Sequence, residues 1–369
     1  MKYPLFLFAS ILFSLSLYSQ EKELKPISVE ADLFYGSIME HNPQIAHLIT
    51  GHPTGFFASL NYKTYGFNEW ERRNNFPDWG FTIAYQNLHN EYLGEVVGIY
   101  GHINWYFLKR HLMLRVGQGI GYASSPYDAE TNFKNNAYGT QFLSTTFLKG
   151  NFVRENIWKG LGIQAGVTII HYSNGNLKAP NNSTNTFAFN AGLSYQFDYK
   201  DFPEYIHQQD SLSSTHAERF KYNFAFRTGV NESDVVGLGA EPFYELSFFV
   251  DKRINYKSTF VAGVDVFFST FLKELITYRS IAYPEDGISG DEDYKRVGLF
   301  VGHEWRFNRV ALVSQLGYYV YWPYEFETRV YNRLGLKRYF LNDNLFATIT
   351  VHAHWAKAES VEFGVGVRL

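Results

Sequence analysis

Apolar residues alternate with other residues along most of this chain, in segments of about ten residues. The clearest example runs from Leu161 to Ile169, and the same pattern resumes from Phe187 to Phe197. Successive side chains of a β-strand point to opposite faces, so a period of two predicts strands with one apolar face. About eight such segments precede residue 199, and about eight follow residue 218. The sequence therefore predicts an all-β protein.

Aromatic residues make up 19% of the chain, with 28 tyrosines and 34 phenylalanines. Aromatic-rich strands are typical of transmembrane β-barrels, whose aromatic side chains gather at both membrane interfaces. A soluble β-sandwich is the alternative, but it would need a second sheet to cover the apolar face of nearly every strand. Short connections such as Asn308 also alternate with long ones such as Thr277–Asp293, which we interpret as a loop. Short periplasmic turns and long external loops are the outer-membrane pattern.

We expect a transmembrane outer-membrane β-barrel of about sixteen antiparallel strands, arranged in two halves of about eight. One large barrel is favoured over two tandem barrels. The first half covers residues 20–198 and the second covers residues 219–369. A polar stretch at residues 199–218, broken by Pro203, forms the predicted linker between them.

The amino-terminal residues predict export. Met1-Lys2 is followed by the largely apolar run Pro4–Leu17 and then by polar residues from Gln20. The run is short for a membrane-spanning helix, and residues 1–19 match a secretory signal peptide. The chain contains no cysteine, which excludes a lipoprotein, disulfides and thiolate metal sites. These observations indicate the outer membrane of a bacterium.

Three polar residues lie on an apolar strand face near residue 175. Continuing the alternation past Ile169 puts His171 and Ser173 on the apolar face, and Asn185 shares it on the returning strand. Same-face residues lie about 6.6 Å apart along a strand, and cross-strand neighbours meet on one face. A base, a hydroxyl and an amide are thus placed where an apolar substrate carrying a polar bond can reach them.

The segment His171-Tyr172-Ser173-Asn174-Gly175, followed by Lys178, Pro180 and Asn181, resembles the active-site signature of outer-membrane lipid A 3-O-deacylases (PagL-type acyloxyacyl hydrolases). The resemblance implies a barrel that removes an ester-linked 3-hydroxyacyl chain from lipid A. It implies His171 as general base and Ser173 as nucleophile. It also implies oxyanion or turn-shaping roles for Asn174, Gly175 and Asn181.

The sequence departs from this family at Asn185, where the family has a glutamate that orients the histidine. An amide oxygen can fix the imidazole tautomer, but it stabilises the imidazolium only weakly. Asp128 or Glu130, in the preceding long loop, is the alternative source of a carboxylate. We therefore predict a catalytic set of His171, Ser173 and Asn185.

The second half lacks a comparable motif. Its strand pattern turns His352 and His354 inward, where we expect hydrogen bonds to Glu304 or Glu362 rather than a metal. The predicted inward faces also carry many charges: Arg296, Glu304, Arg306, Arg333, Lys337, Glu362 and Arg368. Such charges are tolerated in a barrel lumen when they are paired or hydrated.

The sequence supports two hypotheses. The first is a serine ester hydrolase in the outer membrane that removes an acyl chain from lipid A, lipopolysaccharide or a related glycolipid. The alternative is a non-catalytic barrel, either a channel or a lipid-binding structural protein. We expect no cofactor, no metal and no nucleic-acid partner, because the sequence has no phosphate-binding glycine loop, metal-ligand cluster or basic and aromatic patch. Membrane lipid is the expected surrounding partner.

Overall fold

The computed structural model describes residues 26–197, 199–201, 203–207 and 218–369, and it contains two closed β-barrels of eight antiparallel strands each. The predicted signal peptide lies outside the described residues. In the first barrel each strand pairs with the next and β8 pairs with β1. Its strands are β1 (Ile27–Ile38), β2 (Thr54–Tyr62), β3 (Asp78–Asn87), β4 (Glu95–Phe107), β5 (Leu112–Ala123), β6 (Phe142–Trp158), β7 (Leu161–Ser173) and β8 (Thr184–Gln196).

The second barrel repeats this arrangement and is closed by pairing between β16 and β9. Its strands are β9 (Lys221–Asn231), β10 (Glu241–Arg253), β11 (Ser258–Ser269), β12 (Lys295–Phe307), β13 (Val310–Tyr321), β14 (Val330–Phe340), β15 (Leu345–His354) and β16 (Lys357–Arg368). The single sixteen-stranded barrel that we favoured is not the arrangement found. The hydrogen bonds between β1 and β8 close the first half before the chain reaches β9.

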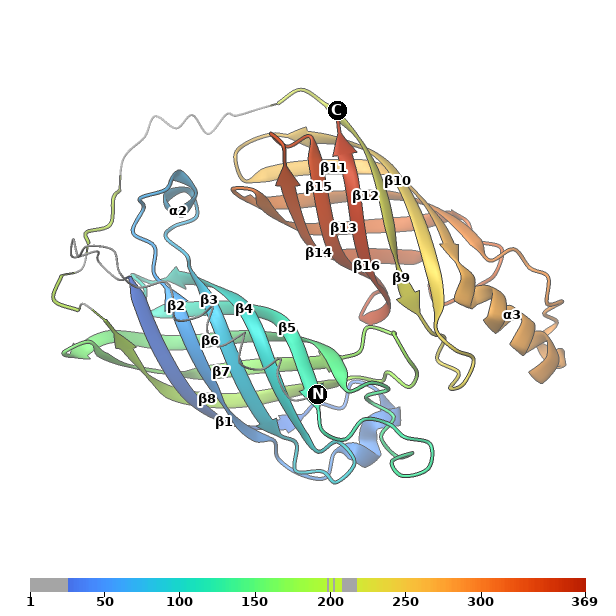
Figure 1. Ribbon diagram of the computed structural model, residues 1–369, viewed down its shortest axis with the longest axis horizontal. Helices are drawn as coiled ribbons and strands as arrows, with labels where there is room; N and C mark the ends of the chain where they lie inside the picture. Colours follow the sequence, from blue (N-terminus) through green and yellow to red (C-terminus); the bar gives the residue numbers. More distant parts are fainter. Residues whose placement is uncertain (1–25, 198, 202, 208–217) are drawn as a thin grey trace, which may run out of the picture.

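One end of each barrel holds the start of its first strand and the end of its last strand (Figure 1). Five of the connections at that end are tight turns, at residues 108–111, 159–160, 254–257, 308–309 and 341–344. The opposite end carries long loops, including residues 39–53, 124–141 and 270–294. Short turns are periplasmic and long loops extracellular in outer-membrane barrels, so the β7–β8 connection lies at the extracellular end.

In the described part of the chain, four helical segments lie in the connections: η1 (Pro43–Leu48), α2 (Glu69–Arg73), α3 (Thr270–Ala282) and η2 (Pro284–Asp286). The sequence predicts a loop at residues 277–293, but α3 occupies the start of that range. Phe271, Leu272, Leu275 and Ile276 are buried on one side of α3, packed against Tyr324. Among the described residues, no helix is long and apolar enough to cross a membrane.

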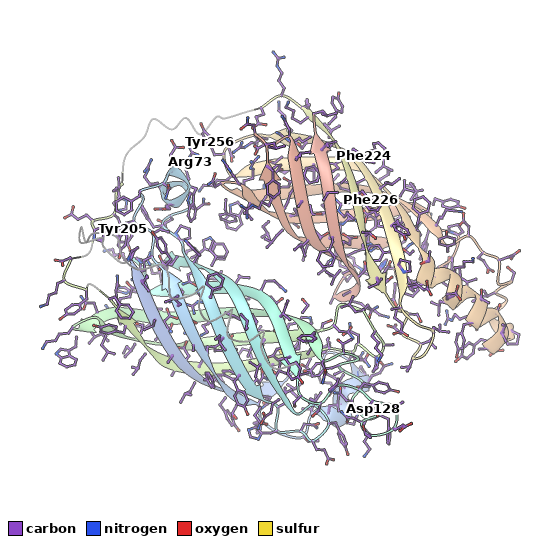
Figure 2. The ribbon with its side chains drawn as sticks, viewed as in Figure 1. Arg73, Asp128, Tyr205, Phe224, Phe226 and Tyr256 are labelled. Atoms are coloured by element: carbon purple, nitrogen blue, oxygen red, sulfur yellow. The ribbon has the colours of Figure 1, made fainter. Side chains whose placement is uncertain are left out.

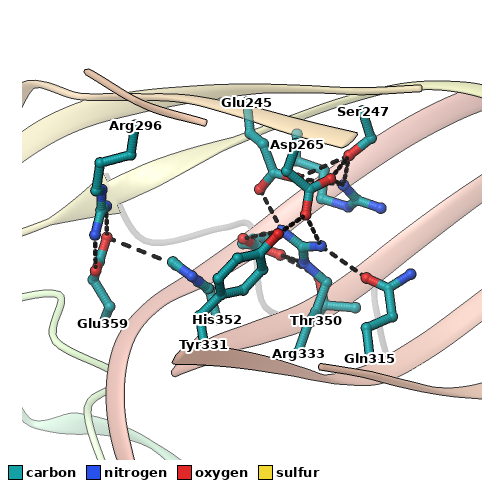
Figure 3. Close-up of polar contacts among 12 residues, drawn as sticks. Glu245, Ser247, Asp265, Arg296, Gln315, Tyr331, Arg333, Thr350, His352 and Glu359 are labelled. Carbon is teal, nitrogen blue, oxygen red and sulfur yellow. Dashed lines mark hydrogen bonds and ion pairs between the residues drawn. The ribbon is translucent and has the colours of Figure 1, made fainter. Parts of the chain in front are cut away.

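Paired polar side chains and clusters of buried aromatic side chains together fill each lumen. In the first barrel, Arg115 Nη2 lies 2.7 Å from Glu30 Oε2, and Lys149 Nζ lies 2.9 Å from Asp32 Oδ2. In the second, Arg333 contacts Glu245 at 2.6 Å, Asp265 at 2.9 Å and Glu362 at 2.7 Å (Figure 3). An eight-stranded barrel is just wide enough for side chains to fill its interior.

The charged residues predicted to face inward in the second half are all buried there, as are His352 and His354. The predicted histidine partners were wrong. His354 Nε2 lies 2.9 Å from Glu359 and His352 Nε2 lies 3.1 Å from the Tyr319 hydroxyl, instead of contacting Glu304 or Glu362. Glu304 instead pairs with Lys337. The bulge between His352 and Ala353 shifts the register between β15 and β16 at this point, and the strand pattern alone does not reveal it.

The two barrels contact each other side by side. Near their periplasmic ends, Trp105 of β4 stacks on Trp305 of β12 with ring centroids 5.7 Å apart. The Arg73 guanidinium lies 3.6 Å from the ring centroid of Tyr256, in the β10–β11 turn (Figure 2). At the extracellular end the β7–β8 turn meets the second barrel, as described below.

Candidate active site

His171 and Asn185 face each other across the β7–β8 ladder. His171 Nδ1 lies 2.8 Å from Asn185 Oδ1. An amide oxygen only accepts hydrogen bonds, so this contact places the imidazole hydrogen on Nδ1 and leaves Nε2 as a proton acceptor. The structure therefore brings together the predicted base and the predicted orienting residue, in the tautomer that a general base requires.

Ser173 is buried, with 6% of its surface exposed, and its hydroxyl group is held by the turn that follows it. Its Oγ donates to Asn181 Oδ1 at 3.1 Å and accepts from the backbone N–H of Gly175 at 3.0 Å. The structure thus groups Ser173 with Gly175 and Asn181. His171 precedes Ser173 by two residues on the same strand.

The β7–β8 turn is built by asparagine side chains. Asn181 Oδ1 also accepts from the backbone N–H of Asn174 at 2.9 Å. Asn174 Nδ2 donates to the Lys178 carbonyl at 2.6 Å, and Asn174 Oδ1 accepts from the Asn176 N–H at 3.0 Å. The side-chain amides of Asn174 and Asn181 therefore stabilise the conformation of the turn. Gly175 has a φ of 65°, a conformation that strains other residues.

An apolar surface adjoins these polar groups. Val167, Ile169 and Phe189 point outward from β7 and β8, and the Phe187 and Phe189 rings meet edge to face at 5.6 Å. This is the outward face that the alternation predicts. Such a surface can hold an acyl chain along the barrel wall, beside the polar groups of His171 and Ser173.

Extracellular loops also hold the turn, through residues that the sequence pattern does not indicate. His41 Nε2, in the β1–β2 loop, lies 3.1 Å from the Asn182 carbonyl and 3.2 Å from Ser183 Oγ. The Asn182 N–H donates to the Asn136 carbonyl at 3.1 Å. These partners are distant in sequence and belong to irregular loops, so no periodic pattern indicates them.

Asp128 is engaged within its own loop. Its Oδ1 accepts from the Thr131 N–H at 2.8 Å, the Thr131 hydroxyl at 2.9 Å and the Glu130 N–H at 3.0 Å. These hydrogen bonds, led by the one from the Thr131 backbone, lower the pKa of Asp128. Asp128 lies at the extracellular end of the first barrel (Figure 2). The structure places Asn185, rather than Asp128 or Glu130, on His171 Nδ1.

Among the residues that the structure describes, no group of three or more His, Cys, Asp or Glu side chains is arranged to hold a metal. The polar groups of the site are instead a base with an amide partner and a hydroxyl with a backbone N–H donor. This set is suited to acyl transfer.

Two family models match the chain and together cover most of it. The model for lipid A 3-O-deacylase (PagL) matches residues 54–194, and the model for the acyloxyacyl hydrolase C-terminal domain matches residues 220–369. The fold and these matches define a class of outer-membrane β-barrel ester hydrolases. The chain belongs to the lipid A 3-O-deacylase family, as the signature at His171–Asn181 predicts, and it is a lipid A deacylase.

Other comparisons add little. No curated protein matches the chain. Among solved structures, a mutant of the Rhodopseudomonas blastica porin is 8% identical over 93% of this chain and 99% of the porin, with a TM-score of 0.19. A triple mutant of the same porin has the same identity and coverage, with a TM-score of 0.20.

Proposed function

We propose that the deacylase reaction follows a serine mechanism at the β7–β8 hairpin. The observation that supports it is the hydrogen bond between His171 Nδ1 and Asn185 Oδ1, which leaves Nε2 free to accept a proton two residues from a buried serine hydroxyl. Rotation of Ser173 about its Cα–Cβ bond would exchange the Asn181 partner for His171 Nε2. The apolar wall beside the hairpin would hold the acyl chain.

In the first half-reaction Ser173 Oγ attacks the ester carbonyl of lipid A while its proton passes to His171 Nε2. The bond between the acyl carbon and the sugar oxygen then breaks, and the imidazolium returns the proton to that oxygen. This leaves an acyl group on Ser173. In the second half-reaction His171 takes a proton from water, and the hydroxide attacks the acyl carbonyl. The bond between the acyl carbon and Ser173 Oγ then breaks, His171 returns the proton to Oγ, and the free fatty acid departs.

Gly175 is our candidate for the oxyanion donor. Its N–H lies 3.0 Å from Ser173 Oγ, beside the place where negative charge develops on the carbonyl oxygen. Asn174 and Asn181 act as turn-shaping residues, since their side chains are bonded within the turn. Asn185 orients His171 in place of the carboxylate found in the family.

The remaining predictions concern the whole chain. We propose export through residues 1–19, and a division into a deacylase-like half at 20–198, a polar linker at 199–218 and a second half without a catalytic motif at 219–369. The acyl chain removed is the ester-linked 3-hydroxyacyl chain of lipid A or a closely related glycolipid.

Mass spectrometry of lipid A tests this mechanism. Cells producing the wild-type protein should lose the mass of one hydroxyacyl chain, and cells producing Ser173→Ala or His171→Ala should not. Ser144→Ala is the matched control, because Ser144 lies directly opposite Ser173 on β6. It should leave the deacylated species unchanged. Deacylation by folded Ser173→Ala protein would contradict the serine mechanism.

A further inference from the structure

The second barrel contacts the β7–β8 turn through one buried carboxylate. Glu232 follows the last residue of β9 and is only 4% exposed. Its Oε2 accepts from the backbone N–H of Ala179 at 2.8 Å, and its own backbone N–H donates to the Asn176 carbonyl at 2.8 Å. Two hydrogen bonds therefore join the barrels on the turn that carries Gly175.

Burying a carboxylate costs free energy unless its oxygens accept hydrogen bonds, and both oxygens of Glu232 do so. Its second oxygen, Oε1, accepts from the Gly239 N–H at 2.9 Å, which ties the side chain to the β9–β10 loop. Hydrogen bonds to an ionised acceptor are about twice as strong as neutral ones. Glu232 is thus a charged bridge anchored on the second barrel at one oxygen and on the turn at the other.

A second contact involves Gly175 itself. Val361 projects from β16 toward it, and a Cβ added at Gly175 would lie 2.5 Å from Val361 Cγ2. The second barrel therefore packs directly against the backbone whose N–H contacts Ser173 Oγ. Lys178 lies between Asn176 and Ala179 in the sequence, and its carbonyl accepts a hydrogen bond from the Asn174 side chain. The two hydrogen bonds to Glu232 therefore also hold the segment that carries this carbonyl.

We infer that the second barrel is a positioning element for the deacylase site, with Glu232 as the positioning residue that holds the β7–β8 turn. This inference rests on the proposed serine mechanism. Glu232 and Val361 fix the turn from outside the first barrel and keep the Gly175 N–H aimed at the developing oxyanion. This gives the otherwise motif-free second half a role in the reaction.

The test is steady-state kinetics of the full chain in detergent micelles with lipid A as substrate. We expect Glu232→Ala to lower kcat roughly 10- to 100-fold with KM changed less than about twofold. Glu232→Gln keeps one acceptor oxygen and should fall between. Asp234→Asn is the matched control, because Asp234 lies two residues away and pairs with the exposed Lys357 on the second barrel. It should retain wild-type kcat.

Hydrogen exchange separates positioning from folding. Glu232→Ala should speed amide exchange at residues 174–181, while heat-modifiable migration on gels shows that both barrels remain closed. Val361→Phe independently perturbs the packing of the second barrel against the β7–β8 turn. It tests the positioning role if Glu232→Ala does not fold. It should lower kcat as well, because the larger ring presses on Gly175.

Wild-type kcat in folded Glu232→Ala and Val361→Phe would overturn the inference. Ser173→Ala, measured in parallel, distinguishes the two proposals. If Ser173→Ala is active, the serine mechanism fails whatever Glu232 does. If Ser173→Ala is inactive and both second-barrel variants are fully active, only the positioning role fails.

Discussion

The His171 imidazole and the Asn185 amide form a hydrogen-bonded pair across one rung of the β7–β8 ladder, with 2.8 Å between Nδ1 and Oδ1. The pairing is antiparallel, so both side chains leave the sheet on the same face. An amide supplies the acceptor that fixes the tautomer, but not the negative charge that stabilises an imidazolium.

One substitution at Asn185 should therefore lower kcat, and another should raise it. Asn185→Leu removes the acceptor and should lower kcat about 10- to 100-fold, because the tautomer is no longer fixed. Asn185→Glu adds the missing charge at the same position and should raise kcat. Fatty acid release from lipid A by the purified protein measures both. Equal rates for the Leu variant and the wild type would show that His171 needs no orienting partner.

Asn181 offers a separate test of the turn. Its Oδ1 accepts from both Ser173 Oγ and the Asn174 N–H, so Asn181→Leu leaves two donors without their partner. We expect kcat to fall by about 10-fold or more, while Asn181→Asp, which keeps an acceptor oxygen, loses less. Acyl release assays on refolded variants provide the comparison. The expectation fails if the Leu and Asp variants are equally active.

The second barrel should lose stability in acid through Glu218. Burial opposes ionisation of this carboxyl group, but hydrogen bonds and charge from Arg368 and Arg253 outweigh it and lower the pKa of Glu218 to about 2. The pKa of Glu218 in the folded state lies below its unfolded value of about 4.3. The stability that the ionised Glu218 contributes to the folded protein is therefore fully present above about pH 4.3. It is lost as the pH falls toward 2.

Urea unfolding in micelles at a series of pH values checks this expectation. The wild-type midpoint should fall between about pH 4.3 and pH 2, and Glu218→Gln should show a smaller fall over the same window. The same pH dependence in both proteins would assign the acid sensitivity to other carboxylates.

Arg333 should be critical to the second barrel. Arg333→Met leaves Glu245, Asp265 and Glu362 buried with Arg227 as their nearby cation. Breaking a buried charge network in this way costs about 3–5 kcal/mol. Lys295→Met removes an exposed ion pair with Asp293 and should cost about 1 kcal/mol or less. Urea unfolding of each variant measures the difference, and similar costs would contradict the expectation.

The filled lumens also predict that the reconstituted protein does not conduct. Lys149 pairs with Asp32 across the first barrel and Arg333 joins three strands in the second, so side chains occupy the path that ions would need. Planar bilayer recordings should show no stable open level. Steady single-channel steps would instead support the non-catalytic channel alternative.

Much of the strand pattern could be predicted because alternation is a local signal. The alternating segment Leu161–Ile169 lies within β7, and the segment that resumes at Phe187 covers most of β8. Helix α3 was missed, although its buried residues follow a helical spacing at Phe271, Leu272, Leu275 and Ile276. It follows β11 directly, with no side-chain N-cap hydrogen bond to mark the change.

The pairing of strands and the contacts between distant side chains were harder to predict than local structure. Alternation shows which face of β8 is apolar, but it does not show whether β8 pairs with β1 or continues to β9, and this choice separates two barrels from one. Alternation also places His171, Ser173 and Asn185 on one face. The contact of Glu232 with Ala179 joins residues 53 positions apart in different barrels, and no local pattern encodes it.

Closure of each barrel on itself has a consequence for how copies of the protein meet. The seams β1–β8 and β9–β16 give every described strand a hydrogen-bonded neighbour on both sides. A sheet without edges offers no template for strand addition from another chain. Encounters between copies in a crowded membrane must therefore rely on side chains and lipid. Exchange of a strand between the two halves would first require breaking a complete ladder.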